Sequence, residues 1–320
     1  MRVVLADGAL IERVLDDTFP VWHEGLSRDA YSKWSRGQLR TPWGREHLQR
    51  FVLLDDAGTH VASLKRYRLP VRVDGHDGWM CGIGAVLTVP EHRGAGHASR
   101  LVEEVLDQSR REGALIAALF SEIGVTFYER LGFSTVALDE VSVRVSRRGG
   151  SPAMLVRFGD DRDLPALAAM HAVRTADARL ALRRDTPLVH YAIAKKRLFA
   201  GLSAPGTRQL EFFVAEEGAS AVAYVVLSQN QYGWTLEEAG DRDPAGARLG
   251  AMFEVLLARE PSLGDPIIRA WWPRGFPAPP QLTLSNRTEP KDVFMVRPLA
   301  DGIEVPSGPE GVFWWRSDYF

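Results

Sequence analysis

Residues 89–98 read Val89-Pro90-Glu91-His92-Arg93-Gly94-Ala95-Gly96-His97-Ala98, a glycine-rich turn between two regular segments. The residues before it, 80–89, carry no charge until the turn and are typical of a buried strand. After the turn, apolar residues recur at helical spacing, which predicts an amphipathic helix; they are Ala98, Leu101, Val102, Val105 and Leu106. Such a turn presents backbone N–H groups and the positive end of a helix dipole to one anion. The sequence therefore predicts a binding loop for a pyrophosphate.

The spacing of the glycines narrows the identity of this loop. The dinucleotide fingerprint needs G-x-G-x-x-G, and the nucleoside triphosphate loop needs G-x-x-x-x-G-K-[ST]. Neither fits, because no lysine follows the glycines and Arg93 precedes them. The pattern Arg-x-x-Gly-x-Ala, formed by Arg93, Gly96 and Ala98, instead resembles the coenzyme A loop of the GNAT superfamily of N-acetyltransferases. The alternative is an ordinary glycine turn that caps a helix.

A second motif follows at the distance that this family uses. Residues 114–120 are an apolar run suited to a strand buried on both faces. The next segment, 121–133, contains Phe-Tyr-x-x-x-Gly-Phe at Phe127, Tyr128, Gly132 and Phe133, and resembles the second GNAT signature. Its fuller form, Ser-Glu-Ile-Gly-x-x-Phe-Tyr-x-x-Leu-Gly-Phe, is most similar to the lysine N6-acetyltransferase branch. Both motifs lie within residues 80–133.

The resemblance implies a mixed-sheet α/β acyltransferase fold and acetyl-CoA as acyl donor. Backbone groups of Leu87, Thr88 and Val89 would then hold the pantetheine arm, and Phe127 would lie beside the cofactor. The pyrophosphate would lie on the loop amides of Arg93, Gly94, Ala95, Gly96, His97, Ala98 and Ser99. Tyr128 would lie near the thioester sulfur as the general acid. A phenol of pKa about 10 is a mildly uphill proton donor to a thiolate of pKa about 8.5.

The length, composition and charge of the chain limit the classes of protein to which it can belong. A chain of 320 residues exceeds one typical domain, and its 45% hydrophobic and 25% charged residues are those of a soluble globular protein. The net charge of -2 argues against nucleic acid or an acidic membrane as a partner. Cys81 is the only cysteine, which excludes an internal disulfide and a thiolate metal cluster, and no metal site is predicted. Without a signal peptide or a membrane-spanning run, we expect a cytoplasmic protein.

The order of predicted elements suggests two copies of one fold. The first, 1–148, would be the catalytic GNAT domain, closed by a strand at 136–145. A linker at 147–152 leads to a second segment, 152–320, in which helices and strands recur in the same order. Where its coenzyme loop should lie, four carboxylates would repel a pyrophosphate; they are Glu237, Glu238, Asp241 and Asp243. This degenerate copy would shape the acceptor cleft, the alternative being an unrelated α/β domain. The four carboxylates would supply a negative field there or form a solvated loop.

The general base is left open by the sequence. Candidates near the expected cleft are Glu122, Asp139, Glu140 and His23, while His92 and His97 lie in the loop itself. The aromatic chain end, 313–320, offers a further candidate, because Eis-type acetyltransferases are similar in using a C-terminal carboxylate as a base. The Phe320 carboxylate would then enter the first domain's cleft, unless the tail packs on the second domain.

Three functions remain in view. The first is acetylation of a small cationic amine such as lysine, and the second is acetylation of a protein or peptide amine. The third is a non-catalytic acyl-CoA-binding regulatory protein, against which the presence of Tyr128 argues. The sequence does not predict the oligomeric state.

Overall fold

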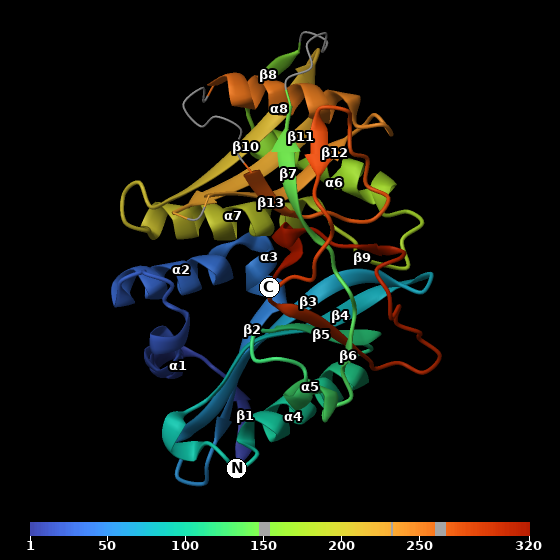
Figure 1. The fold of residues 1–320 in the computed structure, drawn as a ribbon. Helices are drawn as coiled ribbons and strands as arrows, with labels where there is room; N and C mark the ends of the chain where they lie inside the picture. The colour runs from blue at the N-terminus through green and yellow to red at the C-terminus, as the bar shows by residue number, and fades with distance from the viewer. Residues whose placement is uncertain (147–153, 232, 260–266) are drawn as a thin grey trace. The chain divides into compact units, whose positions relative to one another are not determined.

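The computed structural model describes residues 1–146, 154–231, 233–259 and 267–320 (Figure 1). The chain divides into two compact units. The first unit contains Met1–Ala137, Lys291–Gly308 and Phe320, and the second contains Leu138–Pro290 and Pro309–Tyr319. The predicted segments 1–148 and 152–320 therefore do not coincide with the units. The predicted linker at 147–152 lies outside the described residues.

The first unit is built on a mixed sheet in the order β1-β2-β3-β4-β5-β15-β6. Its strands are β1 (Arg2–Leu5), β2 (Leu48–Leu54), β3 (His60–Val73), β4 (His76–Thr88), β5 (Ile116–Ser121), β15 (Val293–Pro298) and β6 (Ser134–Thr135). Only β4 and β5 run parallel along this path, and the other neighbours are antiparallel. The unit's helices are α1 (Gly8–Trp22), α2 (Arg28–Arg40), α3 (Pro42–His47), α4 (His97–Arg111) and α5 (Thr126–Glu129), with a 3-10 turn, η1, at Pro90–His92.

The helix after the glycine turn packs as its periodicity predicts. Leu101, Val102 and Val105 on α4 are fully buried and share a core with Cys81 and Ile83 on β4. This core covers one face of the first sheet. The odd-numbered β4 residues of this segment point into it, so the even-numbered residues there belong to the opposite face.

The predicted last strand of the first sheet is wrong in its placement. Residues Glu140–Val145 do form a strand, β7, but it pairs with β13 and β14 in the second unit. The antiparallel partner of β5 is instead β15, from near the chain end, with Phe294 opposite Phe120. The valines at 141, 143 and 145 are buried, as their alternation predicts, in the second unit's core. A period of two indicates a buried face and does not say which sheet the strand joins.

The second unit has a sheet in the order β14-β7-β13-β12-β11-β10-β8. Its strands are β14 (Leu282–Leu284), β7 (Glu140–Val145), β13 (Ile267–Trp271), β12 (Gly233–Asp241), β11 (Ser220–Asn230), β10 (Arg208–Glu217) and β8 (Leu155–Phe158), and β9 (Leu180–Leu182) pairs in parallel with β16 (Val312–Phe313). The helices are α6 (Leu164–Arg174), α7 (Thr186–Leu202) and α8 (Ala247–Arg259), with 3-10 turns η2 (Asp161–Asp163) and η4 (Arg316–Asp318). β12 was not predicted as a strand through Asp241, because its three carboxylates suggest a loop.

The two units repeat one construction. In the first, the β3–β4 register shifts by a bulge, a helix follows, and β5 then runs parallel to β4. In the second, the β11–β12 register shifts between Val226 and Leu227, α8 follows, and β13 runs parallel to β12. This repetition agrees with the predicted tandem arrangement of one α/β fold.

Within the described ranges, no helix combines the length and the apolar character that crossing a membrane requires.

Candidate active site

The first unit has an open strand edge where β4 runs on beyond β5. The parallel pairing of the two strands runs from Met80–Ile116 to Ile83–Leu119. β4 continues to Thr88 through a bulge at which Ala85 has a φ of 49°. A bulge bends the strand that carries it. Residues 84–88 therefore lie past the last position at which β4 pairs with β5.

The direction of the backbone groups along this edge refines the predicted pantetheine contacts. The Val89 N–H donates to the Val61 carbonyl on β3 at 3.0 Å, and the Val89 carbonyl accepts from the His92 N–H. The main-chain groups of Val89 therefore already have partners within the chain, and its predicted contact with the pantetheine arm stays a prediction. Since successive residues of a strand turn to opposite edges, Leu87 faces β3 as well, while Val86 and Thr88 face the open edge. The motif placed the strand and could not resolve this alternation.

The glycine turn presents the start of α4 without a side-chain cap. Gly94 and Gly96 have φ values of 82° and 77°, and an added Cβ would meet nothing within 4 Å at either position. Glycine is thus needed here for its left-handed backbone rather than for space. Gly96 is the N-cap and has no side chain to bond the first amides of the helix. The amides of His97, Ala98 and Ser99 are therefore oriented toward an incoming anion.

Residues 93–95 of the glycine turn are exposed, and the turn is held by contacts between residues close together in the chain. Arg93, Gly94 and Ala95 are exposed, and Arg93 Nε donates to the Thr88 carbonyl at 3.3 Å. The rings of His92 and His97 meet edge to face with centroids 6.3 Å apart. Every predicted pyrophosphate contact, Arg93 through Ser99, therefore lies on one continuous surface turn.

Tyr128 lies on α5 in an aromatic setting. Its ring meets Phe127 and Phe133 edge to face, with centroids 4.9 and 6.0 Å apart. The side chain is buried, and burial, followed by the charge of Glu122, raises the pKa of Tyr128 to about 12. The phenol is therefore fully protonated at neutral pH, which is the state that a proton donor requires.

Phe320 leaves the rest of the aromatic chain end and joins the first unit. Phe313 and Trp315 belong to the core of the second unit, whereas Phe320 is assigned to the first. Its ring lies 5.3 Å from that of Tyr67 and 5.4 Å from that of Phe120. The alternative that the whole tail packs on the second unit is therefore wrong for this last residue.

The main-chain carbonyl of Phe320 lies beside Gly84, one residue past the last paired position of β4 and β5. A Cβ built on Gly84 would be 3.5 Å from the Phe320 main-chain oxygen and 3.7 Å from its carbon. A Cβ on Gly82 would lie 2.9 Å from the Phe320 ring. Both glycines permit the close approach of the chain end to β4. The alternation Gly82-Ile83-Gly84 is the sequence signal that indicates this approach.

Several side chains predicted as candidates for the general base lie in the second unit or already have hydrogen-bond or ion-pair partners. Asp139 and Glu140 belong to the second unit, where Asp139 pairs with Arg274 and Arg287 and Glu140 accepts from the Trp271 indole. His23 accepts from the Gly25 N–H through Nδ1. Glu122 is exposed beside the tyrosine helix.

In the second unit, a carboxylate of the chain itself occupies the position at the start of α8 that corresponds to the predicted pyrophosphate site at α4. Asp241 is buried, and its carboxylate accepts from the N–H groups of Leu249 at 3.0 Å and Asp243 at 2.8 Å. It therefore caps α8 where the first unit leaves α4 uncapped. A phosphate group at this position would have to displace the Asp241 carboxylate, and the prediction that the second copy binds no coenzyme stays a prediction.

The neighbouring carboxylates do not form the predicted negative field. Glu237 is buried and accepts from Lys196 at 2.6 Å and from Ser228 at 2.5 Å. Glu238 is fully buried and pairs with Arg184 at 2.6 Å and with Ser317. Paired charges of this kind are internal to the unit and do not attract an acceptor.

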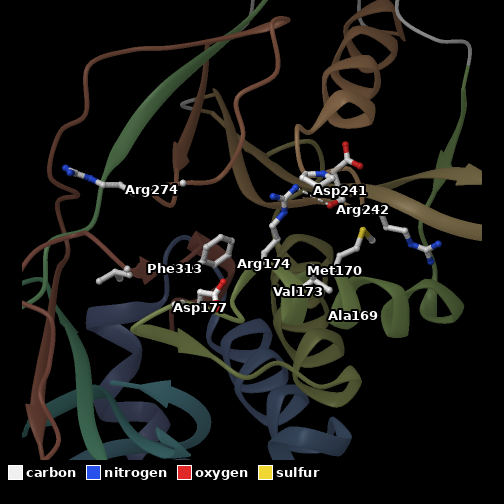
Figure 2. A pocket seen from close by; sticks show the side chains of 14 residues that line it. Ala169, Met170, Val173, Arg174, Asp177, Asp241, Arg242, Arg274 and Phe313 are labelled. Carbon is white, nitrogen blue, oxygen red and sulfur yellow. Dashed lines mark hydrogen bonds between the residues drawn. The ribbon is translucent and has the colours of Figure 1, made fainter. Parts of the chain in front are cut away.

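The second unit also contains a pocket of about 570 Å³ (Figure 2). Met170, Val173 and Phe313 line it together with arginines that already have partners. Arg174 donates to the Asp243 carbonyl at 2.7 Å, and Arg274 pairs with Asp139. The described lining includes two aspartates but no serine, threonine, cysteine, lysine, histidine or tyrosine, so it offers no side-chain nucleophile of the usual kinds.

Comparison with known proteins identifies the first unit. A sequence model of the acetyltransferase (GNAT) domain matches residues 20–136. Residues 20–136 of this chain thus match a GNAT acetyltransferase domain. The GNAT match ends one residue before the first stretch of the first unit ends. No curated protein sequence matches the chain.

Solved structures share the fold over both units. A GCN5-related N-acetyltransferase from Anabaena variabilis has a TM-score of 0.68 at 14% identity, over 93% of this chain and 73% of its own. An Enterococcus faecalis protein described as a probable N-acyltransferase has a TM-score of 0.69 at 13% identity, over 93% and 72%. Eis1 from Mycobacterium abscessus has a TM-score of 0.60 at 14% identity, over 93% and 74%. At these identities the likeness shows the fold, and together with the GNAT domain it supports an acyl-CoA-dependent N-acetyltransferase.

Proposed function

We propose that this chain transfers the acetyl group of acetyl-CoA to a primary amine by direct attack, with Tyr128 as general acid and a terminal Phe320 carboxylate as general base. GNAT domains use acetyl-CoA as acyl donor. The observation that carries the proposal is the open edge of β4 between an uncapped α4 and the Phe320 carboxyl group.

The residues present fit coenzyme A. The amides of the glycine turn and of the first α4 turn would bind the pyrophosphate, and the Val86 and Thr88 backbone would bind the pantetheine arm. The bound coenzyme supplies the thioester as the activated acyl group. The thioester would then lie where β4 passes the end of its pairing with β5.

The chain's own groups move the protons. The Phe320 carboxylate accepts a proton from the attacking amine, and the Tyr128 hydroxyl donates one to the departing thiolate sulfur. A neutral phenol suits this task because its proton is needed only as negative charge develops on sulfur.

For the acceptor we propose a small amine, with lysine as the first candidate. The segment 121–133 carries the similarity to the lysine branch, and a protein or peptide amine is the alternative. The test is a thiol-release assay with acetyl-CoA and separate panels of amino acids, polyamines, aminoglycosides and peptides. Cys81 is fully buried and burial raises its pKa to about 11, so the enzyme's own thiol contributes little background.

The assay is run beside calorimetric titration with coenzyme A. Turnover with a small amine supports the proposal, and turnover with peptides alone transfers it to the peptide class. Tight coenzyme binding with no turnover on any panel would overturn it in favour of a regulatory acyl-CoA-binding protein.

The role of Phe320 has its own test. Appending one glycine after Phe320 keeps the side chain and converts the carboxylate into an amide. We expect turnover to fall at least 100-fold, on the scale of a lost general base, with coenzyme affinity unchanged. Full activity of the extended chain would exclude the Phe320 carboxylate as base.

A further inference from the structure

The segment just before Phe320 is held by a buried cluster of charges in the second unit. Arg184 lies between two carboxylates, 2.6 Å from Glu238 Oε2 and 3.5 Å from Asp318 Oδ1. Glu238 is fully buried, and Arg184 and Asp318 are each 5% exposed. Asp318 belongs to η4, whereas Arg184 directly precedes α7 by sequence and Glu238 lies on β12. The cluster therefore ties η4 to residues that are distant in the sequence.

Hydrogen bonds extend this anchor over residues 317–319. The Ser317 hydroxyl donates to the Glu238 carboxylate, and Lys195 Nζ donates to the Tyr319 carbonyl at 2.6 Å. Buried ion pairs add little net stability compared with apolar groups of the same size, and their best-attested use is to fix one arrangement of the chain. Three consecutive residues of the terminal segment are thus fixed by polar partners within the second unit.

This anchor restricts the next residue, Phe320. One residue spans at most about 3.6 Å of chain, so the Phe320 carboxyl group stays close to the anchored Tyr319 carbonyl. A tail without an anchor would lose backbone freedom each time its carboxyl group entered a site. Order that exists before the substrate arrives removes this loss from the reaction. The cluster therefore favours a carboxyl group that is already in place.

We propose that the cluster of Arg184, Glu238 and Asp318 positions the Phe320 carboxylate, and that holding this segment is the contribution of the second unit to catalysis. This inference rests on the proposed function, in which that carboxylate is the general base. The three are positioning residues, because they act on the segment before Phe320 and not on the substrate. The second copy, whose helix α8 is capped by its own Asp241, thereby has a role other than coenzyme binding.

The direct test reports the order of Phe320 without any turnover. 4-Fluorophenylalanine is placed at position 320 of the full chain, where the ring lies 5.3 Å from that of Tyr67 and 5.4 Å from that of Phe120. These rings shift its 19F resonance away from that of the free amino acid. We compare wild type with Asp318→Asn, which keeps the size of the side chain and an oxygen for the Trp315 N–H. In Asp318→Asn we expect about half of this shift or more to be lost, because a released chain end frays.

Asp163→Asn is the matched control in the same unit. Asp163 is the third residue of η2, as Asp318 is of η4; it is 4% exposed and pairs with Arg157 at 2.7 Å. The substitution removes a buried charge of the same kind from a turn that does not lead to Phe320, so the 19F resonance should match wild type. The proposal is overturned if Asp318→Asn also matches wild type, or if both variants lose the shift equally through general destabilisation.

A milder variant keeps the test open if Asp318→Asn does not fold. Ser317→Ala leaves every charge of the cluster in place and removes one hydrogen bond to Glu238. We expect a smaller loss of the 19F shift in the same direction. A Ser317→Ala resonance identical to that of wild type would then overturn the proposal.

Kinetics separate positioning of the base from general stability. In Asp318→Asn we expect kcat to fall about tenfold, while the KM for acetyl-CoA stays within about twofold. In the chain extended by one glycine after Phe320, the same substitution should change the residual turnover by less than about twofold, because the carboxylate that it positions is already gone. A tenfold loss in both backgrounds would overturn the proposal. If the enzyme acetylates nothing, the 19F shift still decides whether the cluster orders Phe320, so the two proposals fail separately.

Discussion

At the scale of single residues, the surroundings of a side chain set its chemistry. Tyr128 was identified from a motif, and its buried aromatic site explains why it remains protonated. The approach of Phe320 to Gly82 and Gly84 was not predicted, although the alternating glycines indicate that something lies close to the strand there. Which distant segment packs against a strand is not encoded in its local pattern.

The phenol of Tyr128 gives the first prediction. Tyr128→Phe removes the proton donor and keeps the ring, so we expect kcat to fall 10²-fold or more while the acetyl-CoA dissociation constant changes less than threefold. The measurement is steady-state kinetics with titration calorimetry. The matched control is Tyr31→Phe, which removes a hydroxyl bonded to Thr18 at 3.0 Å and should keep kcat near wild type. Unchanged turnover in Tyr128→Phe would remove the assignment.

His171 gives a prediction on stability and pH. It is buried, its Nε2–H donates to the Leu182 carbonyl at 3.0 Å, and burial with the charge of Arg184 lowers its pKa to about 3. The unfolded chain takes up the proton near pH 6.5, so the contribution of neutral His171 is present above that pH and is lost as the pH falls toward 3. We expect the free energy of unfolding to fall by about 2 kcal/mol between pH 7 and pH 5 from this group.

Urea unfolding at the two pH values measures this loss, and His171→Gln is the comparison. The glutamine retains a donor and does not titrate, so its loss over the same interval should be about 2 kcal/mol smaller. An equal loss in both proteins would show that His171 does not cause it.

At the scale of elements, the helices that follow β4 and β12 differ in how they begin, and this difference decides whether the start of the helix is open to a ligand. α4 begins at a glycine with no side-chain cap, and α8 begins under the Asp241 carboxylate. Periodicity and turn residues predicted α4 and the strands before and after it, β4 and β5. They did not predict β12, because Glu237 and Glu238 are strand residues whose buried partners, Lys196 and Arg184, come from distant parts of the chain.

The left-handed backbone at Gly96 gives a prediction for the loop. Gly96→Ala meets open space and adds strain only through φ, which costs about 1–2 kcal/mol. We expect coenzyme A to bind about tenfold more weakly, which corresponds to about 1.4 kcal/mol of loop distortion. Titration calorimetry measures the binding, and urea unfolding measures the strain.

Gly201→Ala is the matched control. This glycine lies within α7, has no positive φ, and meets nothing within 4 Å. Alanine there should leave binding unchanged and stabilise the helix by up to about 1 kcal/mol. Equal coenzyme affinity in Gly96→Ala and wild type would contradict the importance of the glycine turn.

At the scale of the whole molecule, the two units share the chain by exchanging strands. The first unit takes β15 and Phe320 from the end of the sequence, and the second takes β7 from the first half. Repeated elements along the chain indicated the tandem fold. They did not indicate the exchange, because an alternating apolar strand fits either sheet.

The exchange predicts that the sequential half is not a folding unit. A fragment of residues 1–148 lacks β15, which leaves β5 without its outer partner and β6 without any strand partner in its sheet. Unpaired edges of this kind promote aggregation. We expect the fragment to show no cooperative urea transition by circular dichroism.

A rearranged chain provides the control. Residues 1–137 joined through a short glycine-serine linker to residues 291–308 contain every strand of the first sheet's path. This protein should unfold cooperatively. A cooperative transition in the 1–148 fragment of the same amplitude as in the rearranged chain would contradict the account.

The position of β15 also bears on how the protein is made. The ribosome delivers residues in order, and the outer partner of β5 is residues 293–298 of 320. Translation must therefore pass residue 298 before the sheet of the first unit can close. During that interval the nascent chain exposes an apolar strand edge, so its yield in cells should depend on chaperones that shield emerging polypeptides.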